Sequence, residues 1–362
     1  MIIALDLILN LFVLAVQQSN TTTYNSISPN DFSNYICYTT NEKISIDGKL
    51  NENSWKFAPF SNSFVDIEGE NKPTPLHDTR IKILWDEEYL YIGALLDETH
   101  IWATYTDRES VIFHENDFEI FIDPNGDTHN YYEIEVNALN TIWDLLLIKP
   151  YRDLGRAITS WDLKGMKSAV YIEGTINDPS DIDEYWSVEF AFPWSALKEH
   201  AFENRKPKHG EQWRMNFSRV QWKLDIIDGA YSKQINPKTK KYFPEDNWVW
   251  SSQSVINMHR PEIWGYVQFS DIIVGSSKTK FVFNEDEYCK WELRKIYYAQ
   301  KAFKNQHRKF TDKLGKLNYS NEYCLNATIE MKTSEFEFEA TIQQPGKNNA
   351  WIINSEGLIW SE

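Results

Sequence analysis

The segment TRIKILWDEEYLYIGAL, residues 79–95, decides the fold class. It contains two runs rich in β-branched and aromatic residues, Thr79 to Leu84 and Tyr89 to Leu95. Such residues favour strands, and the four residues that separate the runs, 85–88, suit a short connection between paired strands. We therefore predict a hairpin of two antiparallel strands at this place.

Two further pairs of runs continue this pattern downstream. The runs 118–122 and 131–136 flank a segment in which Pro124 and Gly126 fit a turn. The runs 168–176 and 186–192 flank another polar segment. Because many short strands follow one another without a long helical period, the sequence predicts a mainly β protein, an antiparallel β-sandwich of the immunoglobulin or jelly-roll type.

The C-terminal tail has a different pattern. Its apolar residues between 288 and 317 keep helical spacing and predict one long amphipathic helix; they are Leu293, Ile296, Tyr297, Phe303, Phe310, Leu314 and Leu317. Apolar and acidic residues then alternate over 335–342, as in a half-buried strand, and the runs 351–353 and 358–360 predict a hairpin. We therefore predict a small α+β module of unassigned role at 286–362, open to a protein partner.

The charge of the chain is unevenly distributed. The 362 residues include 37 Lys and Arg against 53 Asp and Glu, a net charge of -16, yet residues 271–362 hold 13 of each sign. The first 270 residues therefore carry the whole net charge, and such a surface repels nucleic acid and anionic lipid. This break, with the small polar linker Val274 to Lys278, predicts a domain boundary near 271–285, after a sandwich domain at 38–270.

The N-terminus and the cysteines bear on the compartment. Residues 1–16 are apolar apart from Asp6 and Asn10, too short to span a bilayer, and a polar run follows. Residues 1–17 are predicted to be a signal peptide of a secreted, periplasmic or cell-surface protein with no membrane span in the mature chain. The missing N-terminal Lys or Arg leaves a buried strand or helix as the alternative. A bridge between Cys289 and Cys324 would leave Cys37 unpaired.

Several motifs in order then resemble the family 9 carbohydrate-binding modules, over residues 40–270. They are Ile46-Asp47-Gly48-Lys49-Leu50 with Trp55, and the segments 84–91, 116–123, 186–194 and 264–269. The resemblance implies a β-sandwich that is secreted with, or fused to, polysaccharide-degrading enzymes. It also implies binding of a polysaccharide or oligosaccharide, such as the chain ends of xylan or cellulose, and calcium as the cofactor to expect.

The resemblance also implies site residues. In the family, two Trp side chains sandwich the terminal sugar and an acidic residue takes its hydroxyls. Glu119 falls on the acidic position and Asp97 on a second one. The sequence departs from the pattern because Phe113 and Met258 stand at the Trp positions and Glu135 stands at the position of a sugar-contacting Arg.

Other flat or polar side chains could complete a different sugar-binding surface. Sugar rings stack on aromatic faces, and their hydroxyls need polar partners. The additional candidates are Trp102, Asn137, Trp143, Trp248, Trp250 and His259. Each has a structural alternative: Glu119 and Asp97 could hold loops, and Trp248 and Trp250, on one face of a strand, could form a stripe of the core.

Metal binding and catalysis have weaker support in the sequence. Asp123, Asn125 and Asp127 offer oxygen ligands at alternate positions, as at the start of a calcium-binding loop. No Glu follows at the distance that an EF-hand requires, so a plain turn is the alternative. No nucleotide or G-x-S-x-G motif is present, and no catalytic residue is assigned.

We predict a non-catalytic carbohydrate-binding protein of carbohydrate catabolism. The alternatives are a glycoside hydrolase, which needs two facing carboxylates, and a b-type haem protein with Met258-His259 as ligands.

Overall fold

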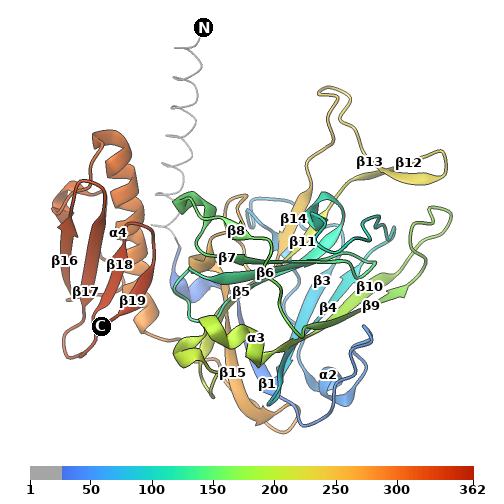
Figure 1. Cartoon of the computed structure of the whole chain (residues 1–362), viewed down its shortest axis with the longest axis horizontal. Coiled ribbons are helices and arrows are strands. Elements are labelled where there is room, and N and C mark those ends of the chain that lie inside the picture. Colours follow the sequence, from blue (N-terminus) through green and yellow to red (C-terminus); the bar gives the residue numbers. More distant parts are fainter. Residues whose placement is uncertain (1–26) are drawn as a thin grey trace. The chain divides into compact units, whose positions relative to one another are not determined.

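The computed structural model describes residues 27–362, so the predicted signal peptide lies outside the described residues. The chain divides into two compact units, residues 32–282 and residues 283–362 together with the described residues 27–31 (Figure 1). Among the described residues, no helix is long and apolar enough to cross a membrane.

The first unit is built on one sheet of 13 strands. Its strands are β1 (Asn34–Thr39), β2 (Val65–Asp66), β3 (Thr79–Trp85), β4 (Tyr89–Asp97), β5 (Asp117–Asp123), β6 (Tyr131–Val136), β7 (Ile142–Leu147), β8 (Ala157–Ile158), β9 (Lys167–Glu173), β10 (Tyr185–Pro193), β11 (Gln212–Gln221), β14 (Asp246–Val249) and β15 (Gly265–Ile273). A separate pair comprises β12 (Leu224–Ile227) and β13 (Ala230–Lys233). The short helices are α2 (Asn53–Phe57), α3 (Trp194–Leu197), η2 (Ile112–His114), η3 (Tyr151–Asp153), η4 (Lys198–His200), η5 (Phe202–Asn204) and η6 (Pro261–Ile263).

The strand order β8-β7-β6-β5-β11-β15-β1-β3-β4-β10-β9 contains all three predicted hairpins. They are the antiparallel pairs β3–β4, β5–β6 and β9–β10. Strand β1 differs from the other strands of this path because it runs parallel to both of its neighbours, β15 and β3. It therefore joins the two halves of the sheet, which carry the antiparallel hairpins.

The two halves of this sheet face each other across one core. Ile81 and Ile92, from β3 and β4, share a buried cluster with Ile120 and Ile134, from β5 and β6, although these pairs of strands are not neighbours in the sheet. The predicted mainly β sandwich is thereby confirmed. Eight tryptophans of the unit are buried. Six of them belong to this core cluster, namely Trp85, Trp186, Trp194, Trp213, Trp248 and Trp250, whereas Trp55 and Trp264 belong to two smaller clusters.

The motif at residues 46–50 has a structural role. The carboxylate of Glu189, which is fully buried on β10, accepts hydrogen bonds from the backbone N–H groups of Asp47 (2.9 Å) and Gly48 (2.6 Å) and from the indole of Trp55 (2.7 Å). Gly48 has φ +88°, and a Cβ there would lie 2.5 Å from the backbone nitrogen of Tyr171. Only glycine fits this approach of the turn to β9.

The second unit consists of helix α4 (Asp286–His307), a four-stranded antiparallel sheet and the short helices η1 (Pro29–Asp31) and η7 (Leu314–Lys316). The sheet contains β16 (Thr328–Thr333), β17 (Phe338–Gln343), β18 (Trp351–Asn354) and β19 (Ile359–Ser361). The predicted closing hairpin is the pair β18–β19. Strand β16 was not predicted from the sequence.

Helix α4 is shorter than the predicted helix. It ends before Arg308, which adopts a left-handed conformation (φ +61°) and donates its backbone N–H to the carbonyl of Lys304. The polar run 305–309 offers no apolar side chain to continue the buried stripe, and Phe310 leaves the helix to pack against Phe338, 5.0 Å between ring centroids. Phe336, expected in the strand, precedes β17 and is 71% exposed.

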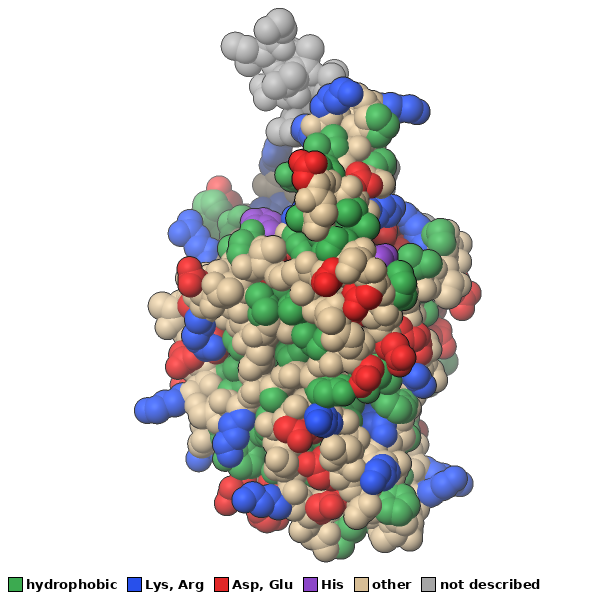
Figure 2. All heavy atoms as spheres, turned by 90° about the vertical axis from the view of Figure 1, so that its right-hand side faces the viewer, with side chains coloured by type: hydrophobic (Ala, Val, Ile, Leu, Met, Phe, Trp, Pro, Cys, Tyr) green, Lys and Arg blue, Asp and Glu red, His purple; other side chains and the backbone are tan. Residues whose placement is uncertain are grey.

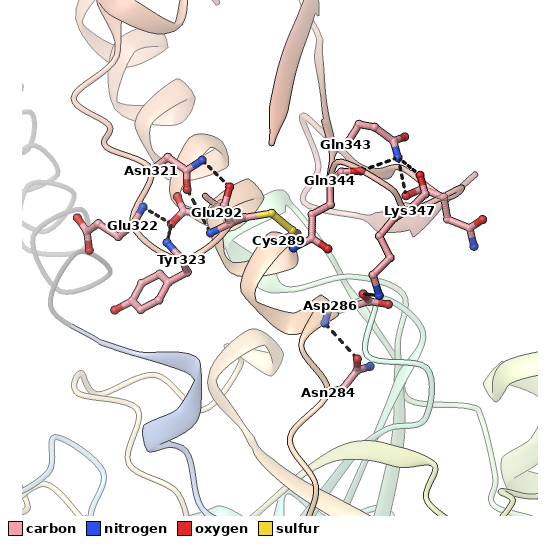
Figure 3. The surroundings of a disulfide bond; sticks show 12 residues. Asn284, Asp286, Cys289, Glu292, Asn321, Glu322, Tyr323, Gln343, Gln344 and Lys347 are labelled. Carbon is pink, nitrogen blue, oxygen red and sulfur yellow. Dashed lines mark hydrogen bonds and ion pairs between the residues drawn. A yellow bond between two sulfur atoms is a disulfide. The ribbon is translucent and has the colours of Figure 1, made fainter. Parts of the chain in front are cut away.

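A disulfide joins Cys289 of α4 to Cys324, with 5.0 Å between their Cα atoms (Figure 3). The cysteine count left this bridge open, and the structure contains it. Beside it, one carboxylate oxygen of Glu292 accepts the N–H groups of Glu322 and Tyr323, both at 2.9 Å. Lys295 of α4 also donates to the carbonyl of Ser320 at 2.8 Å, so the segment before β16 is held on α4 by a covalent bond and several hydrogen bonds. Cys37, in β1, is fully buried and unpaired.

Candidate functional site

Strands β5 and β6 direct acidic side chains away from the core of the sandwich. Side chains alternate along a strand, so the apolar residues of these strands enter the core while Asp117, Glu119, Glu133 and Glu135 share the opposite face. Glu119 and Glu135 are direct partners in the register of the two strands. Four acidic residues therefore gather on one small area of the sheet.

A pocket of about 410 Å³ opens over this face. It takes its walls from β5, β6, β7, β11 and β14, from the helix η3 and from the loop that precedes η6. Its lining residues are Ile67, Phe113, Glu119, Phe121, Glu133, Glu135, Trp143, Leu145, Tyr151, Val220, Glu245, Asn247, Ile256, Asn257, Met258 and His259. Four of the predicted site residues, Phe113, Glu119, Trp143 and His259, are thus brought together.

Three carboxylates form a tight group at the pocket. Asp117, Glu119 and Glu135 each have a carboxylate oxygen within 4.8 Å of the other two. Two ionised carboxylates at that separation repel each other by about 3 kcal/mol at an effective dielectric constant of about 20. Burial raises the pKa of Glu119 to about 7, and burial and then the neighbouring carboxylates hold the pKa values of Asp117, Glu133 and Glu135 well above their usual range.

The hydrogen bonds of these carboxylates are incomplete. Glu135 accepts the backbone N–H of Phe113 at 3.0 Å, and one oxygen of Asp117 accepts the N–H of Val220 at 3.3 Å. The second oxygen of Asp117 and one oxygen of Glu133 are buried without a hydrogen-bond partner. A partner from outside the protein could bind there, because a buried carboxylate oxygen without a donor costs free energy.

Lysine and arginine do not offset this charge within the pocket. Neither residue type is among the described residues that line it. Arg152, close by on η3, donates to Glu262 at 2.9 Å and to the carbonyl of His259 at 3.0 Å. On the face drawn in Figure 2, by contrast, acidic and basic side chains are interspersed. The acidic character of the pocket is therefore a local property.

Aromatic rings form another wall. Phe113, 37% exposed, lies nearly parallel to Trp143, with ring centroids 6.2 Å apart and planes at 29°. Tyr151 packs edge-on against His259, 4.5 Å between centroids. Partly exposed rings beside carboxylates provide the apolar faces and the hydroxyl acceptors that a sugar ring needs.

His259 is held as a neutral ring. Its Nδ1 atom is 3.0 Å from the hydroxyl of Tyr131. Burial, and next the charge of Arg152, lower the pKa of His259 to about 4. The ring therefore offers hydrogen bonds and an apolar edge to the pocket at neutral pH.

Three predicted site residues lie elsewhere. Asp97 is exposed at the end of β4, and Trp102 is half-buried outside the pocket. Asn137 is fully buried, and its side chain donates to the carbonyl of Tyr105 and accepts the N–H of Thr141. Asn137 therefore holds a loop after β6.

Trp248 and Trp250 belong to the core of the sandwich. Each is only 4% exposed, and the ring of Trp250 packs edge-on against Phe217 at 5.7 Å. Side chains alternate along β14, so Asn247 lines the pocket while its neighbour Trp248 points into the core. The two indoles therefore cannot stack on a sugar, and the core stripe considered for them is the arrangement found.

The segment at 123–127 closes a turn. The two oxygens of Asp123 accept the N–H groups of Gly126 (2.9 Å) and Thr128 (2.8 Å), and the Asn125 side chain hydrogen-bonds Asp127 at 2.7 Å. These oxygens serve the backbone of the connection between β5 and β6, as in the plain turn weighed against the calcium loop.

Sequence reasoning missed several members of the pocket. Glu133 escaped notice, although the alternation in YYEIEV (131–136) indicates one acidic face. Tyr151, Glu245 and Asn247 come from distant segments and carry no comparable signal. A second pocket of about 530 Å³, lined by residues 39–44 and 86–89 among others, holds none of the predicted site residues.

Comparisons with solved structures give distant neighbours. A protein described as a putative carbohydrate-binding protein from Bacteroides uniformis ATCC 8492 has 15% identity and a TM-score of 0.47, covering 66% of this chain and 100% of that one. A carbohydrate-binding module of family 9 from Caldicellulosiruptor kristjanssonii, in complex with cellotriose, has 14% identity and a TM-score of 0.39, covering 68% and 98%. No curated protein matches the chain.

The comparison with family models matches the part of the chain that contains strands β2 to β10. Residues 46–207 match the model described as carbohydrate family 9 binding domain-like. This range includes Glu119, Glu133, Glu135, Phe113 and Trp143 of the pocket. The resemblance predicted from the sequence motifs is thereby confirmed over residues 46–207.

Proposed function

We propose that the sandwich unit binds carbohydrate in the pocket over β5 and β6, without catalysing a reaction. The observation that carries the proposal is the pairing of Phe113 and Trp143 beside Glu119 in one pocket within the matched region. The pocket volume lies in the range of ligand sites. The wall of rings can take the apolar face of a pyranose while the carboxylates accept its hydroxyls.

The proposal extends to the substrate class and the compartment. The motifs that resemble family 9 modules support β-linked polysaccharides such as xylan and cellulose, and a role in carbohydrate catabolism. The apolar segment 1–16 supports secretion, and the bridge between Cys289 and Cys324 fits an oxidising compartment. Cello- and xylo-oligosaccharides are therefore the first ligands to test.

The test is a glycan array followed by calorimetry on the purified chain. We expect binding of at least one oligosaccharide, and we expect Trp143→Ala to weaken it at least about tenfold, because one buried aromatic contact contributes more than about 1 kcal/mol. Trp102→Ala is the matched control, since it removes a half-buried indole outside the pocket. Equal losses in the two variants, or no binding of any glycan, contradict the proposed site. A Soret band in the purified protein would favour the haem alternative.

A second candidate function, glycoside hydrolysis, is favoured by one observation. Glu119 has a pKa raised to about 7 by burial and lies next to Glu135, so one carboxyl could hold a proton while the other is ionised. Release of reducing ends from a β-1,4-glycan that disappears in Glu119→Gln would support an enzyme. Binding without turnover supports the module.

A further inference from the structure

An arm projects from the sandwich unit between strands β11 and β14 (Figure 1). It comprises residues 222–245, which hold the hairpin β12–β13 and the loop that follows it, and the hairpin is not part of the 13-stranded sheet. In the loop, Ile235 pairs with Tyr242, and the carbonyl of Asn236 accepts the backbone N–H of Lys240 at 2.9 Å. The outer turn of the arm therefore has a hydrogen-bonded frame.

The arm carries charge of the opposite sign to the rest of its unit. It contains five lysines against three acidic residues, whereas the other residues of 1–270 contain 19 lysines and arginines against 37 aspartates and glutamates. Residues 229–243 contain four of the five lysines and no acidic residue; these lysines are Lys233, Lys238, Lys240 and Lys241. An anion is therefore attracted to the arm and repelled by much of the surface around it.

The lysines of the outer turn are available to a ligand. Lys238, Lys240 and Lys241 are all exposed. Of the five lysines of the arm, Lys223 is the one that has an ion pair among the described residues, at 3.9 Å from Asp246. The turn thus presents three ammonium groups to solvent within four residues, without a carboxylate of the described chain bound to them.

Aromatic rings adjoin the fourth lysine. The ammonium nitrogen of Lys233 lies 3.4 Å from the ring centroid of Trp222 and 5.7 Å from that of Tyr242. Tyr242 is 57% exposed, so its ring is open to solvent. A flat ring beside a cation suits a sugar that carries a carboxylate, because the ring takes the apolar face of the sugar and the ammonium group binds the anion.

The arm is joined to the pocket of the proposed function. The indole N–H of Trp222 donates to the backbone carbonyl of Phe113 at 3.0 Å, and Phe113 lines that pocket. Glu245, at the end of the arm, also lines it. The pocket contains several glutamates, and neither lysine nor arginine lines it among the described residues, so it disfavours an anionic sugar. A neutral sugar is therefore expected inside the pocket and an acidic one beside it, on the arm.

The apolar end of the hairpin favours a glycan over a membrane as the ligand. Ile226 and Ile227, next to the turn between β12 and β13, are 55% and 53% exposed. Asp225 and Asp228 flank them. A segment that enters an anionic bilayer carries cations beside its apolar side chains, whereas these two carboxylates are repelled by anionic headgroups.

We propose that the arm, residues 222–245, binds the carboxylates of an acidic polysaccharide, a chain that contains uronic acids, beside the pocket. The proposal rests on the proposed function for the class of ligand and adds the charge of that ligand. The three exposed lysines of the outer turn bind carboxylates there, and Lys233 binds one beside the rings. Exposed charge pairs are individually weak, so several of them act together along the arm.

The experiment compares acidic oligosaccharides with their own neutral forms, by calorimetry on the full-length chain. The probes are glucuronoxylo-oligosaccharides and oligogalacturonates, and the neutral forms are the same samples after reduction of the carboxyl groups to alcohols. We expect at least one acidic probe to bind about tenfold more tightly than its neutral form at low ionic strength. The difference should shrink at high ionic strength, because salt screens exposed charges.

A triple variant tests the arm directly. It changes the three lysines of the outer turn, as Lys238→Gln, Lys240→Gln and Lys241→Gln. It should remove most of the preference for the acidic probe and keep the affinity for the neutral form within about twofold. The matched control removes three exposed lysines of the same unit outside the arm, as Lys56→Gln, Lys164→Gln and Lys198→Gln. The control should keep the preference within about twofold, and circular dichroism verifies that both variants are folded.

Three results overturn the proposal. The first is equal affinity for the acidic and neutral forms of both probes, and the second is an equal loss of preference in the two triple variants. The third is sedimentation of the chain with phosphatidylglycerol vesicles that is lost in the arm variant, without any preference for an acidic glycan. That third result would assign the arm to a lipid surface.

Trp143→Ala separates this proposal from the proposed function. If the pocket holds the glycan, this variant weakens the binding of acidic and neutral forms alike. Binding of neutral glycans with no preference for acidic ones keeps the pocket and removes the role of the arm. Binding of an acidic glycan that depends on the lysines of the arm and not on Trp143 keeps the arm and removes the pocket.

Discussion

At the residue scale, Glu189 explains why a short motif near the start of the matched region has its sequence. Its two oxygens accept three N–H groups, from Asp47, Gly48 and Trp55, and a carboxylate suits all three because both of its oxygens only accept. The motif and the strand β10 are therefore one unit, although more than 130 residues separate their hydrogen-bonded partners.

Replacing Glu189 by Gln tests that unit. The amide group must face either the two backbone donors or the indole of Trp55, so at least one buried N–H loses its acceptor. We expect the free energy of unfolding to fall by about 2 kcal/mol, measured by urea unfolding at neutral pH. Glu88→Gln, an exposed change on the same unit, should shift it by less than about 0.5 kcal/mol. Similar effects in the two variants would contradict the role of Glu189.

His259 predicts how stability depends on pH. Its pKa is lowered to about 4 in the folded chain, against about 6.5 in an unfolded chain, so below pH 6.5 the unfolded state binds a proton that the folded state does not. The contribution is fully present above pH 6.5 and is lost as the pH falls toward 4. At pH 5 the loss is about 2 kcal/mol.

The measurement compares urea unfolding of the wild-type chain and of His259→Asn at pH 7.5 and at pH 5.0. The difference between the two proteins should move in favour of the variant by about 2 kcal/mol at the lower pH. The comparison cancels the carboxylates that titrate in both proteins. A difference that is independent of pH would show that His259 accepts its proton in the folded state.

The residue scale also marks the limit of sequence reasoning about the site. Glu119 could be predicted because it lies in a motif with a family counterpart, and it does line the pocket. Trp248 and Trp250 could not be assigned, because alternation shows that two residues share a face and not whether that face is inside. Burial depends on which strands cover β14, and that is a property of the fold.

At the element scale, local pattern predicted the hairpins well and the helix end poorly. The pairs β3–β4, β5–β6 and β9–β10 follow from short connections and period-two alternation. Helix α4 ends at His307, where no proline or glycine marks the stop. Phe310 keeps helical spacing by coincidence and lies beyond the helix, where its ring packs against Phe338 of β17.

The disulfide is the element whose removal has the largest expected effect on the second unit. Cys289 and Cys324 close a loop with a sequence separation of 35 residues, and loop-closure entropy of that length corresponds to about 4 kcal/mol. We expect reduction with dithiothreitol, or the double change of both cysteines to serine, to lower the unfolding free energy of this unit by about 3 kcal/mol. Unchanged unfolding after reduction would mean that the hydrogen bonds of Glu292 suffice.

At the scale of the whole molecule, two units with separate cores should unfold separately. Residues 32–282 hold the sandwich and its pocket, and residues 283–362 hold α4 and its sheet. We expect scanning calorimetry of the full chain to resolve two transitions. Reductant should lower the temperature of one transition, that of the unit with the disulfide, and leave the other unchanged. A single transition that shifts as a whole with reductant would contradict two independent units.

The high content of aromatic residues in the whole chain gives little information about its function. Eight of the tryptophans in the sandwich unit are buried, so most of the excess of large rings serves packing. The net charge of -16 likewise includes a buried share at Asp117, Glu119, Glu133 and Glu135. Composition could predict an acidic, aromatic domain, but only the register of β5 and β6 gathers its carboxylates.

The burial of Cys37 makes the folded chain unreactive toward thiol reagents. The other two cysteines are bonded to each other, and Cys37 lies at zero exposure in β1, the strand that joins the two halves of the sandwich. A reagent can reach it only when that junction opens. The rate of labelling of Cys37 in the absence of denaturant therefore reports how often the sandwich opens at β1. A ligand that binds the closed state of the sandwich slows this labelling.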